Sequence, residues 1–329
     1  MPENKFNPQI NISRSTSTRM WLVACCAMLA VIQSASGDSG ASLIVAATAL
    51  ISAILAELLL TQKKYRFSKI KDGSAAASAL IFALLLPNQI HPLYAALGAA
   101  FAMVVIKYSF GGLGSNWLNP ALGAWLFVRF SWPQAFTGAL AGTPEYLADA
   151  GSIIDQFVRG FLNKAVFVFF GTELPPGYID LFSQRIPGII ADRAGLVLVL
   201  GTLLMTAFQI SRYWLSLLYL VIFGFLVRMA GDLSGVLWNG DVLLALFSGG
   251  TLLTAFVLAA DPSTGAKSVP GRAFMMIIAA AMGFVFRIYA SALYGCFYAV
   301  AAVNALTPLL CRLERRLFYS QTASGGGYE

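Results

Sequence analysis

The chain has 329 residues, of which 58% are hydrophobic and only 11% are charged, and its mean hydropathy is +0.73. This composition excludes a soluble globular protein and is typical of a chain that crosses a membrane several times. The net charge of +7 comes from Lys and Arg residues spread between apolar segments. Such a distribution indicates membrane topology, and we expect no nucleic-acid partner.

Ten apolar segments approach or reach the ~20 residues that a helix needs to cross a bilayer. They are 20–36, 41–61, 73–87, 92–107, 115–131, 194–211, 213–230, 241–260, 272–287 and 289–310. The excess of Lys and Arg in alternate connections places both termini in the cytoplasm. The sequence therefore predicts an all-α polytopic membrane protein with about ten transmembrane helices.

The longest hydrophilic stretch divides the ten segments into two sets of five. The predicted organisation is a cytoplasmic segment 1–19, a first membrane half 20–131, an extracytoplasmic loop 132–193, a second membrane half 194–311 and a cytoplasmic tail 312–329. Because five is an odd number, we expect the two halves to have inverted orientations, as in transporter-like folds with broken helices.

A weak internal repeat agrees with two related halves. The stretch from Lys107 to Asn119 resembles the stretch from Arg287 to Asn304, since each runs from a basic residue next to aromatic and polar residues to an asparagine that opens an apolar segment. A shared bias toward Ala and Leu accounts for part of this likeness, so the repeat by itself does not establish the inverted arrangement.

The most informative string is FGGLGSNWLNPALG, from Phe110 to Gly123. Its glycines, asparagines and proline interrupt a helix at membrane depth, which is costly unless neighbouring protein shields the backbone. Such breaks are typical of sites where polar groups face a ligand, a cofactor or an ion. Asn116 and Asn119 therefore have two interpretations: they bind a ligand or cation, or they cap the broken helix.

Four ionisable residues lie in or at the ends of apolar segments. Glu57 is a candidate ion or proton ligand, or a carboxylate that reaches the basic loop 63–71. Lys107 and Arg287 either anchor helix ends or stabilise an anionic ligand. Asp261 precedes a proline and either ends its helix or lies beside a bound ligand or on an ion path.

Three motifs resemble a known family. They are FGGLGSNWLNPALG, the preceding KDGSAAASALIFALLLP (Lys71 to Pro87) and AADPST (Ala259 to Thr264). Together they resemble the D subunit of the Rnf electron-transport complex and the homologous B subunit of the sodium-pumping NADH:quinone oxidoreductase. The likeness extends from about Ser13 to Leu310; the first motif is quite specific, whereas the other two alone are weak.

The resemblance implies a ten-helix subunit of the bacterial inner membrane that carries electrons on flavins. In the family, FMN is joined by a phosphoester bond to a threonine of the extracytoplasmic loop, within a motif close to Ser-Gly-Ala-Thr. The best match here is Thr143, preceded by Gly142. The usual hydroxyl residue two places before the alanine is missing, unless Thr137 belongs to that piece, so a subunit without covalent flavin is the alternative.

The resemblance also implies a second, non-covalent flavin, riboflavin or FMN, nearer the cytoplasmic side. Asn116, Asn119, Asp261 and Lys107 are the candidate residues for it. The implied partners are the other Rnf subunits, including a periplasmic flavoprotein and iron–sulfur subunits, and the implied coupling is to sodium or proton movement. Two other classes stay open, namely a channel or secondary transporter for a small polar solute such as urea or ammonia, and a structural scaffold within such a complex.

Overall fold

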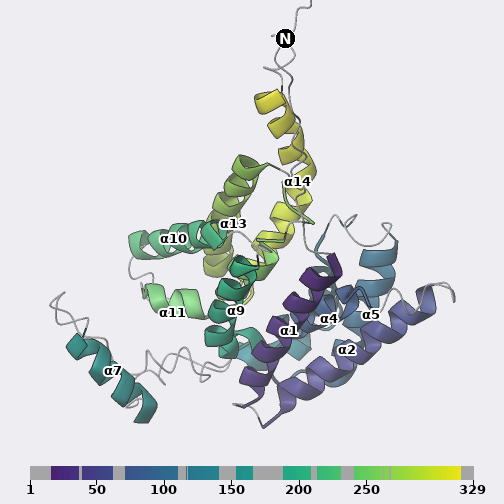
Figure 1. The fold of residues 1–329 in the computed structure, drawn as a ribbon, viewed down its shortest axis with the longest axis horizontal. Helices are drawn as coiled ribbons and strands as arrows, with labels where there is room; N and C mark the ends of the chain where they lie inside the picture. Colours follow the sequence, from purple (N-terminus) through teal and green to yellow (C-terminus); the bar gives the residue numbers. More distant parts are fainter. Residues whose placement is uncertain are drawn as a thin grey trace, which may run out of the picture.

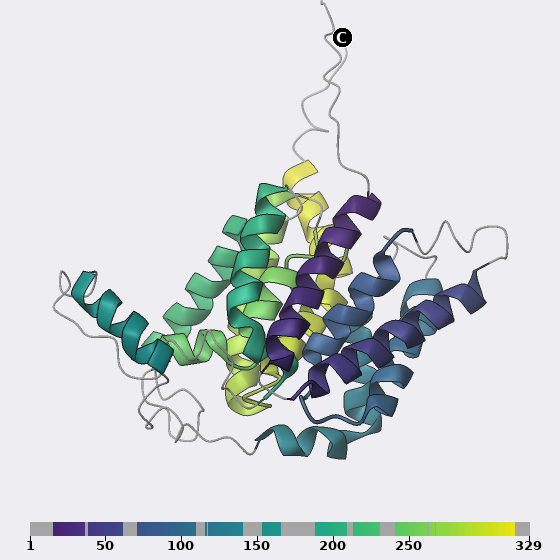
Figure 2. The ribbon, with the colours of Figure 1, turned by 60° about the horizontal axis from the view of Figure 1, so that its bottom comes forward.

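The computed structural model is helical throughout the part of the chain that it describes, as the sequence predicts. The described residues are 16–36, 39–61, 71–109, 116, 118–140, 153–165, 188–208, 213–230, 241–261, 263–266 and 268–319. Their helices form two groups, one from each predicted membrane half (Figures 1 and 2).

The N-terminal group begins with two long helices and continues with shorter ones. Its elements are α1 (Thr16–Ala35), α2 (Ala41–Leu60), α4 (Ser74–Leu85), α5 (Pro92–Phe101) continued by the π-helical η2 (Ala102–Tyr108), α6 (Pro120–Ser131) and the 3₁₀ segment η3 (Pro133–Leu140). The predicted extracytoplasmic loop contains α7 (Ile153–Ala165), which lies apart from both groups (Figure 1).

The C-terminal group repeats this mixture of long and broken helices. Its elements are the 3₁₀ segment η6 (Ile190–Ala194), α9 (Gly195–Ala207), α10 (Tyr213–Ala230), α11 (Val242–Phe247), α12 (Thr251–Leu253) continued by the π-helical η7 (Thr254–Leu258), α13 (Val269–Tyr289) and α14 (Gly295–Tyr319).

Six helical segments have the length and apolar composition to cross a membrane. They are Thr16–Ala35, Ala41–Leu60, Ile190–Ala207, Tyr213–Ala230, Val269–Tyr289 and Gly295–Arg312. These helices confirm a multi-pass membrane protein. Each of the other four predicted segments also contains helix, but Ser74–Leu85 and Pro92–Tyr108, for example, are shorter. The count of ten spans and the inverted orientation of the halves stay predictions.

Caps explain where several of these helices begin. Asn119, His91 and Ser268 precede α6, α5 and α13, and the side chain of each accepts a backbone N–H from the first turn. Each of these helices also has a proline in its first turn, where the missing N–H costs nothing. The polar interruptions in the sequence therefore mark helix starts.

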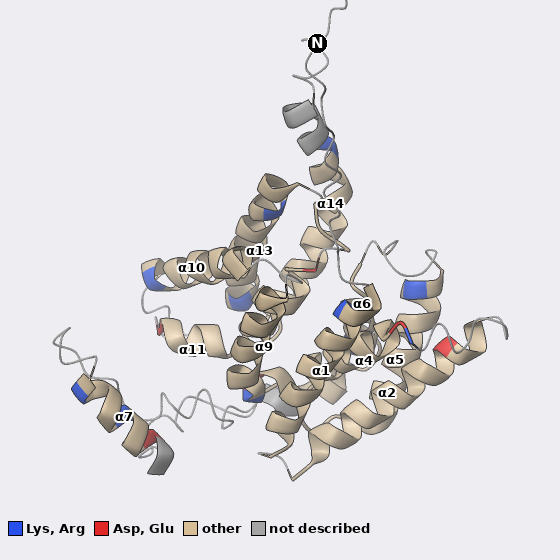
Figure 3. Cartoon of the chain, in the orientation of Figure 1, with Lys and Arg blue, Asp and Glu red and all other residues tan. Residues whose placement is uncertain are grey.

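Small residues line the helix contacts of α2, and its large residues face outward. On α2, Ala49 and Ala53 are fully buried, whereas Ile51 and Leu55 are 58% and 54% exposed. This distribution is that of a helix whose outer face meets lipid. Charged positions are correspondingly sparse along the helices (Figure 3).

The two groups share a pattern of packing. In the first, α2 packs against α5 and α1 packs against α4; in the second, α10 packs against α13 and α13 against α14. The groups meet where α1 contacts α9 and η6 (Figures 1 and 2). This seam, together with the breaks that flank α6 and η7, holds the residues considered next.

Candidate functional site at the helix breaks

The break before α6 is hydrogen-bonded to the break after η7. Asn119 is 6% exposed, and its Oδ1 accepts the backbone N–H of Ala121 at 3.0 Å. Its Nδ2 donates to Asp261 Oδ2 at 2.7 Å, across 142 positions of sequence. The capping interpretation of Asn119 is thus confirmed, and the same amide joins the two halves of the chain.

Asp261 is fully engaged in this junction. Its second oxygen, Oδ1, accepts the backbone N–H of Ser263 at 2.9 Å and the hydroxyl of the same residue at 2.8 Å. A carboxylate with three donors is held in one orientation. Asp261 therefore fixes the start of the turn that follows η7.

Asn116 differs from its neighbour because its polar side chain is not satisfied. It is 8% exposed, and its Oδ1 has no hydrogen-bond partner among the described residues. A buried amide oxygen without a donor is unfavourable by about 1–3 kcal/mol. The structure therefore offers an acceptor at the helix break for a donor that a ligand would supply.

Two more buried polar atoms near the breaks lack partners within the described part of the chain. They are Asn304 Nδ2 on α14 and Thr254 Oγ1 on η7. Thr307 donates to the carbonyl of Thr264 at 3.2 Å, which brings α14 against the turn that follows Asp261. Asn304 precedes Thr307 by three positions and so lies on the same face of α14.

A buried ion pair closes the cytoplasmic end of the first group on the predicted topology. Lys107 Nζ lies 2.5 Å from Glu57 Oε1, and the two side chains are 5% and 2% exposed. The same ammonium donates to Ser74 Oγ at 2.7 Å. Tyr108, which hydrogen-bonds Thr61 at 2.8 Å, adds a long contact of 3.4 Å to Glu57.

This pair adds two details to the sequence-based interpretation. Glu57 has Lys107 as a counterion, and residues 63–70 of the basic loop lie outside the described part of the chain, so a contact of Glu57 with that loop stays a prediction. Lys107 is an anchor of a helix end, as expected, but a buried one that ties η2 to α2 and α4. Sequence reasoning missed Ser74, because a serine in the first turn of an apolar segment is usually only a helix start.

The second group holds its own buried cation at the matching position. Arg287 is 1% exposed and donates to the carbonyls of Ala245 and Ala292 and to the hydroxyls of Ser248 and Thr251. Its guanidinium therefore fixes the turn between α11 and α12 against the end of α13. The expected anchoring role of Arg287 is confirmed, and carbonyl and hydroxyl oxygens of two elements supply its acceptors.

Asp192 was not anticipated as part of this arrangement. It is 3% exposed, and its oxygens accept the backbone N–H groups of Gly249 and Gly250 at 3.1 and 2.7 Å. Gly249 has φ +62°, and a Cβ there would lie 2.8 Å from Arg287 Nη2. Arg287 and Asp192 thus approach the same glycine turn from two elements, and only glycine fits between them.

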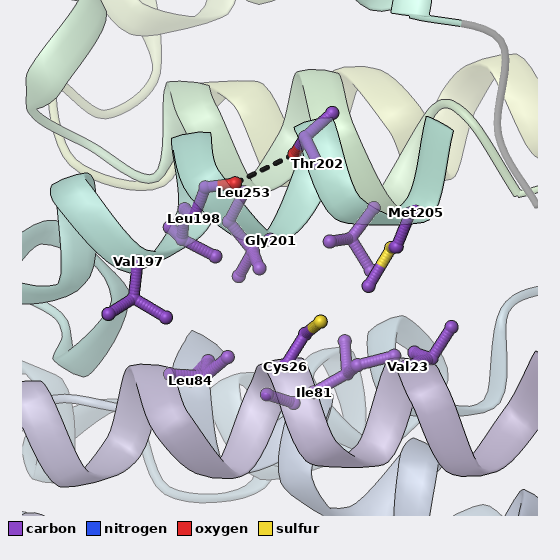
Figure 4. Close-up of a pocket in the computed structure, with 12 residues that line it drawn as sticks. Val23, Cys26, Ile81, Leu84, Val197, Leu198, Gly201, Thr202, Met205 and Leu253 are labelled. Atoms are coloured by element: carbon purple, nitrogen blue, oxygen red, sulfur yellow. Dashed lines mark hydrogen bonds between the residues drawn. The ribbon is translucent and has the colours of Figure 1, made fainter. Parts of the chain in front are cut away.

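The seam between the two groups is apolar and nearly closed. A crevice of about 20 Å³ lies between α1 and α9, lined by Cys26, Leu198, Gly201 and Met205 among others (Figure 4). Thr202 turns its hydroxyl to the carbonyl of Leu198 at 2.7 Å, so it offers no donor to the crevice. A space of this size holds about one water molecule. The seam therefore holds the halves together and has no room for a flavin ring.

Comparison with known proteins identifies the chain's relatives. The model of the NQR2, RnfD, RnfE family matches residues 3–319. The chain belongs to this family. It is 26% identical over 320 residues to the D subunit of the Na⁺-translocating ferredoxin:NAD⁺ oxidoreductase complex of Acetobacterium woodii, covering 96% of this chain and 94% of that protein.

Other members of the family show the same extent of likeness. The D subunit of the proton-translocating ferredoxin:NAD⁺ oxidoreductase complex of Clostridium ljungdahlii is 26% identical over 92% of each chain. The D subunit of the ion-translocating oxidoreductase complex of Vibrio cholerae is 25% identical, covering 92% of this chain and 95% of its own. Since the names of two similar relatives specify different ions, membership of the family leaves the ion open.

Several residues singled out by the sequence lie outside the described part of the chain. These include Thr143 and Gly142, and the Phe110–Ser115 portion of the break. The structure does bring Asn119 and Asp261 together, and it pairs Glu57 with Lys107. The candidate site in the described residues thus consists of two hydrogen-bonded junctions and the unsatisfied amide of Asn116.

Proposed function

We propose that this chain is the flavin-carrying membrane subunit of an Rnf-type, ion-translocating ferredoxin:NAD⁺ oxidoreductase. The observation that carries the proposal is the match of the family model to residues 3–319, together with relatives named as D subunits over nearly their whole length. The chain acts within a complex, and electrons pass through flavins that it holds. This assignment places it in the inner membrane with both termini in the cytoplasm.

Covalent FMN on Thr143 is the first part of the proposal. The support is the Ala-Gly-Thr sequence in the predicted extracytoplasmic loop, directly after η3. A denatured gel band of the wild-type subunit should then fluoresce under ultraviolet light, and Thr143→Ala should abolish the signal. Thr137→Ala is the matched control, because the Thr137 hydroxyl is already bonded to the carbonyl of Gln134 at 2.8 Å.

The gel fluorescence of the two threonine variants shows which of the two threonines carries the flavin. Fluorescence that persists in Thr143→Ala and disappears in Thr137→Ala would move the phosphoester to Thr137. A wild-type band without fluorescence, in an active complex, would show a subunit that carries no covalent flavin. That second result would also favour the solute channel or the structural scaffold over the electron carrier.

A second, non-covalent flavin at the helix breaks is the other part. The residues present fit the pyrimidine edge of such a ring, because Asn116 has a buried acceptor without a donor and Asn304 a buried donor without an acceptor among the described residues. Asn119 and Asp261 would hold the breaks in place around it. The flavin, when bound, supplies the capacity to accept and release electrons; the chain's contribution is to orient the ring and keep it from water.

If this second site exists, a substitution at Asn116 should release the non-covalent flavin and leave the covalent flavin in place. Acid extraction of the wild-type subunit should release one flavin, and Asn116→Leu should reduce that amount while the gel fluorescence is retained. Ser36→Ala is a control, since the hydroxyl of Ser36 bonds locally to the carbonyl of Gln33 at 2.8 Å, far along α1 from the breaks. An unchanged yield of extracted flavin in Asn116→Leu would refute the role of Asn116.

Glu57 belongs to the proposed ion path only under one condition. Its carboxylate is neutralised by Lys107 in the structure, so a translocated cation would have to displace the ammonium. Electron transfer that continues without ion movement in Glu57→Gln would support this role. The channel alternative predicts solute flux through the purified subunit in vesicles, with no dependence on a flavin.

A further inference from the structure

A polar cavity of about 340 Å³ lies where α4, η3 and η6 come together. It is lined on one side by the α4–α5 connection, including Asn88 and His91, on another by Gln134 of η3, and on a third by Arg193 of η6. It lies at the beginning of α5, whereas Lys107 lies at the other end of the same helical rod. On the predicted topology the cavity faces the extracytoplasmic side.

Arg193 brings a positive charge to this cavity that no described lining residue compensates. Its Nε and Nη1 atoms are buried and have no hydrogen-bond partner among the described residues. The carboxylate of the adjacent Asp192 is directed to the glycine turn at 249–250, where its two oxygens accept backbone N–H groups. None of the described residues that line the cavity is acidic. A guanidinium with two buried nitrogen atoms in such surroundings calls for an anion.

Asn88 supplies a second, independent sign of a ligand. Its side chain is 6% exposed, and its Oδ1 lacks a partner among the described residues. The amide can present either its oxygen or its NH₂ group by turning over. A buried asparagine that borders a polar cavity with unmet hydrogen-bonding capacity is typical of a site that a ligand completes.

His91 adds a hydrogen-bond donor, and the start of α5 adds the positive end of a helix dipole. His91 Nδ1 accepts the backbone N–H of Leu93 at 3.2 Å, so in the neutral ring the proton is on Nε2. The first turn of α5 also directs the positive end of its dipole toward the cavity mouth. Tyr94, which meets His91 edge-on at 6.1 Å, forms an aromatic side of the cavity.

We infer that this cavity binds a phosphate ester, held by Arg193, Asn88 and His91. The oxygens of a phosphate ester can each accept more than one hydrogen bond, so a single phosphate can engage all three groups. Two sources of a phosphate ester occur at this membrane face: the headgroup of a phospholipid, and the phosphoester of the flavin that the proposed function places on Thr143, three positions after the end of η3. In the second case the inference rests on the proposed function.

Binding of phosphate probes to the full chain tests the inference. Thr143→Ala protein in neutral detergent removes any covalent flavin, and its affinities for FMN, riboflavin and inorganic phosphate are measured. FMN should bind more tightly than phosphate-free riboflavin, and inorganic phosphate should compete with it. Arg193→Gln should weaken FMN binding about ten- to a hundredfold and leave riboflavin binding unchanged. Arg129→Gln is the matched control, because Arg129 stacks on Phe136 and Tyr294 and does not line the cavity.

A second arm identifies the source of the phosphate. Native mass spectrometry compares retention of phosphatidylglycerol by the wild type, Arg193→Gln and Arg129→Gln after detergent exchange. A loss confined to Arg193→Gln, with no difference between FMN and riboflavin, would assign the cavity to a lipid headgroup. A loss of FMN affinity alone would assign it to the flavin phosphate.

A second, isosteric variant tests the inference independently in case Arg193→Gln does not fold. Asn88→Asp keeps the size of the side chain and adds a negative charge, so it should weaken phosphate binding by a similar factor. The inference is overturned if neither variant changes the affinity for FMN, phosphate or lipid relative to Arg129→Gln. The gel fluorescence of the wild-type subunit, which retains Thr143, does not depend on any of these binding results. Failure of this inference is therefore distinguishable from failure of the proposed function.

Discussion

Replacing Lys107 with methionine tests whether the buried ion pair is a unit. The substitution removes the ammonium that lies 2.5 Å from Glu57 and 2.7 Å from Ser74. It leaves Glu57, 2% exposed, with only the 3.4 Å contact from the Tyr108 hydroxyl on its side chain among the described residues. Removing one partner of a buried pair costs about 3–5 kcal/mol, because the other charge is left without compensation. We expect a loss of that size in the free energy of unfolding.

The double variant Glu57→Leu/Lys107→Met separates the pair from its parts. Since both charges are then absent, its destabilisation should be smaller than the sum of the two single effects by ~1–3 kcal/mol. Unfolding in detergent, followed by tryptophan fluorescence, measures all four proteins, and exposed Lys71→Met is the control. Additive effects, or single variants that lose less than about 1 kcal/mol, would refute the view that the pair joins η2 to α2.

Three further outcomes follow from the described contacts. Asn119→Ala removes a helix cap and the bond to Asp261, so the free energy of unfolding should fall by about 1–3 kcal/mol and the unfolding midpoint with it. An unchanged midpoint would show that the bond between Asn119 and Asp261 does not stabilise the fold. Gly249→Ala should destabilise by about 1–3 kcal/mol, because φ is +62° and Arg287 leaves no room, whereas Gly160→Ala, which meets no atom within 4 Å, should be neutral or stabilising in the same assay. Asp192→Asn should weaken the two hydrogen bonds from the backbone N–H groups of the glycine turn and so speed hydrogen exchange of the amides at 249–250. Exchange at the wild-type rate would show that the Asp192 carboxylate does not stabilise this turn.

The sequence predicts the helical class well because the apolar segments are long and the breaks are marked by polar residues and proline. It places α10 at Tyr213–Ala230, where the predicted segment is also 213–230. The predicted segment 194–211 begins within one residue of α9 (Gly195–Ala207), but the sequence does not predict the short 3₁₀ segment η6 before it. The apolar region begins four positions earlier, at Ile190, because the short 3₁₀ segment η6 buries Asp192 and turns its carboxylate inward.

Site residues are predictable one at a time but not as partners. Glu57 and Lys107 stand out because each is a charge in an apolar segment, yet their contact spans 50 positions and depends on the packing of α2 against η2. The bond between Asn119 and Asp261 likewise exists only once the two halves are assembled. Asp192 gives no such signal, since in the sequence it is one more acid at the end of a hydrophilic loop.

The buried cations and the unsatisfied amides suggest a division of roles within the proposed electron carrier. Lys107 and Arg287 lie at the end of the fourth predicted apolar segment of each half, and each fixes a turn or helix next to a break. Fully bonded charges in a low-dielectric interior hold one geometry, because any other leaves a charge without compensation. Asn116 and Asn304 have polar atoms that no described residue satisfies, so their surroundings can change with the state of a bound flavin at little cost. The two cation anchors are therefore the fixed frame of the proposed site, and Asn116 is the position at which that site can gain a hydrogen bond from a ligand.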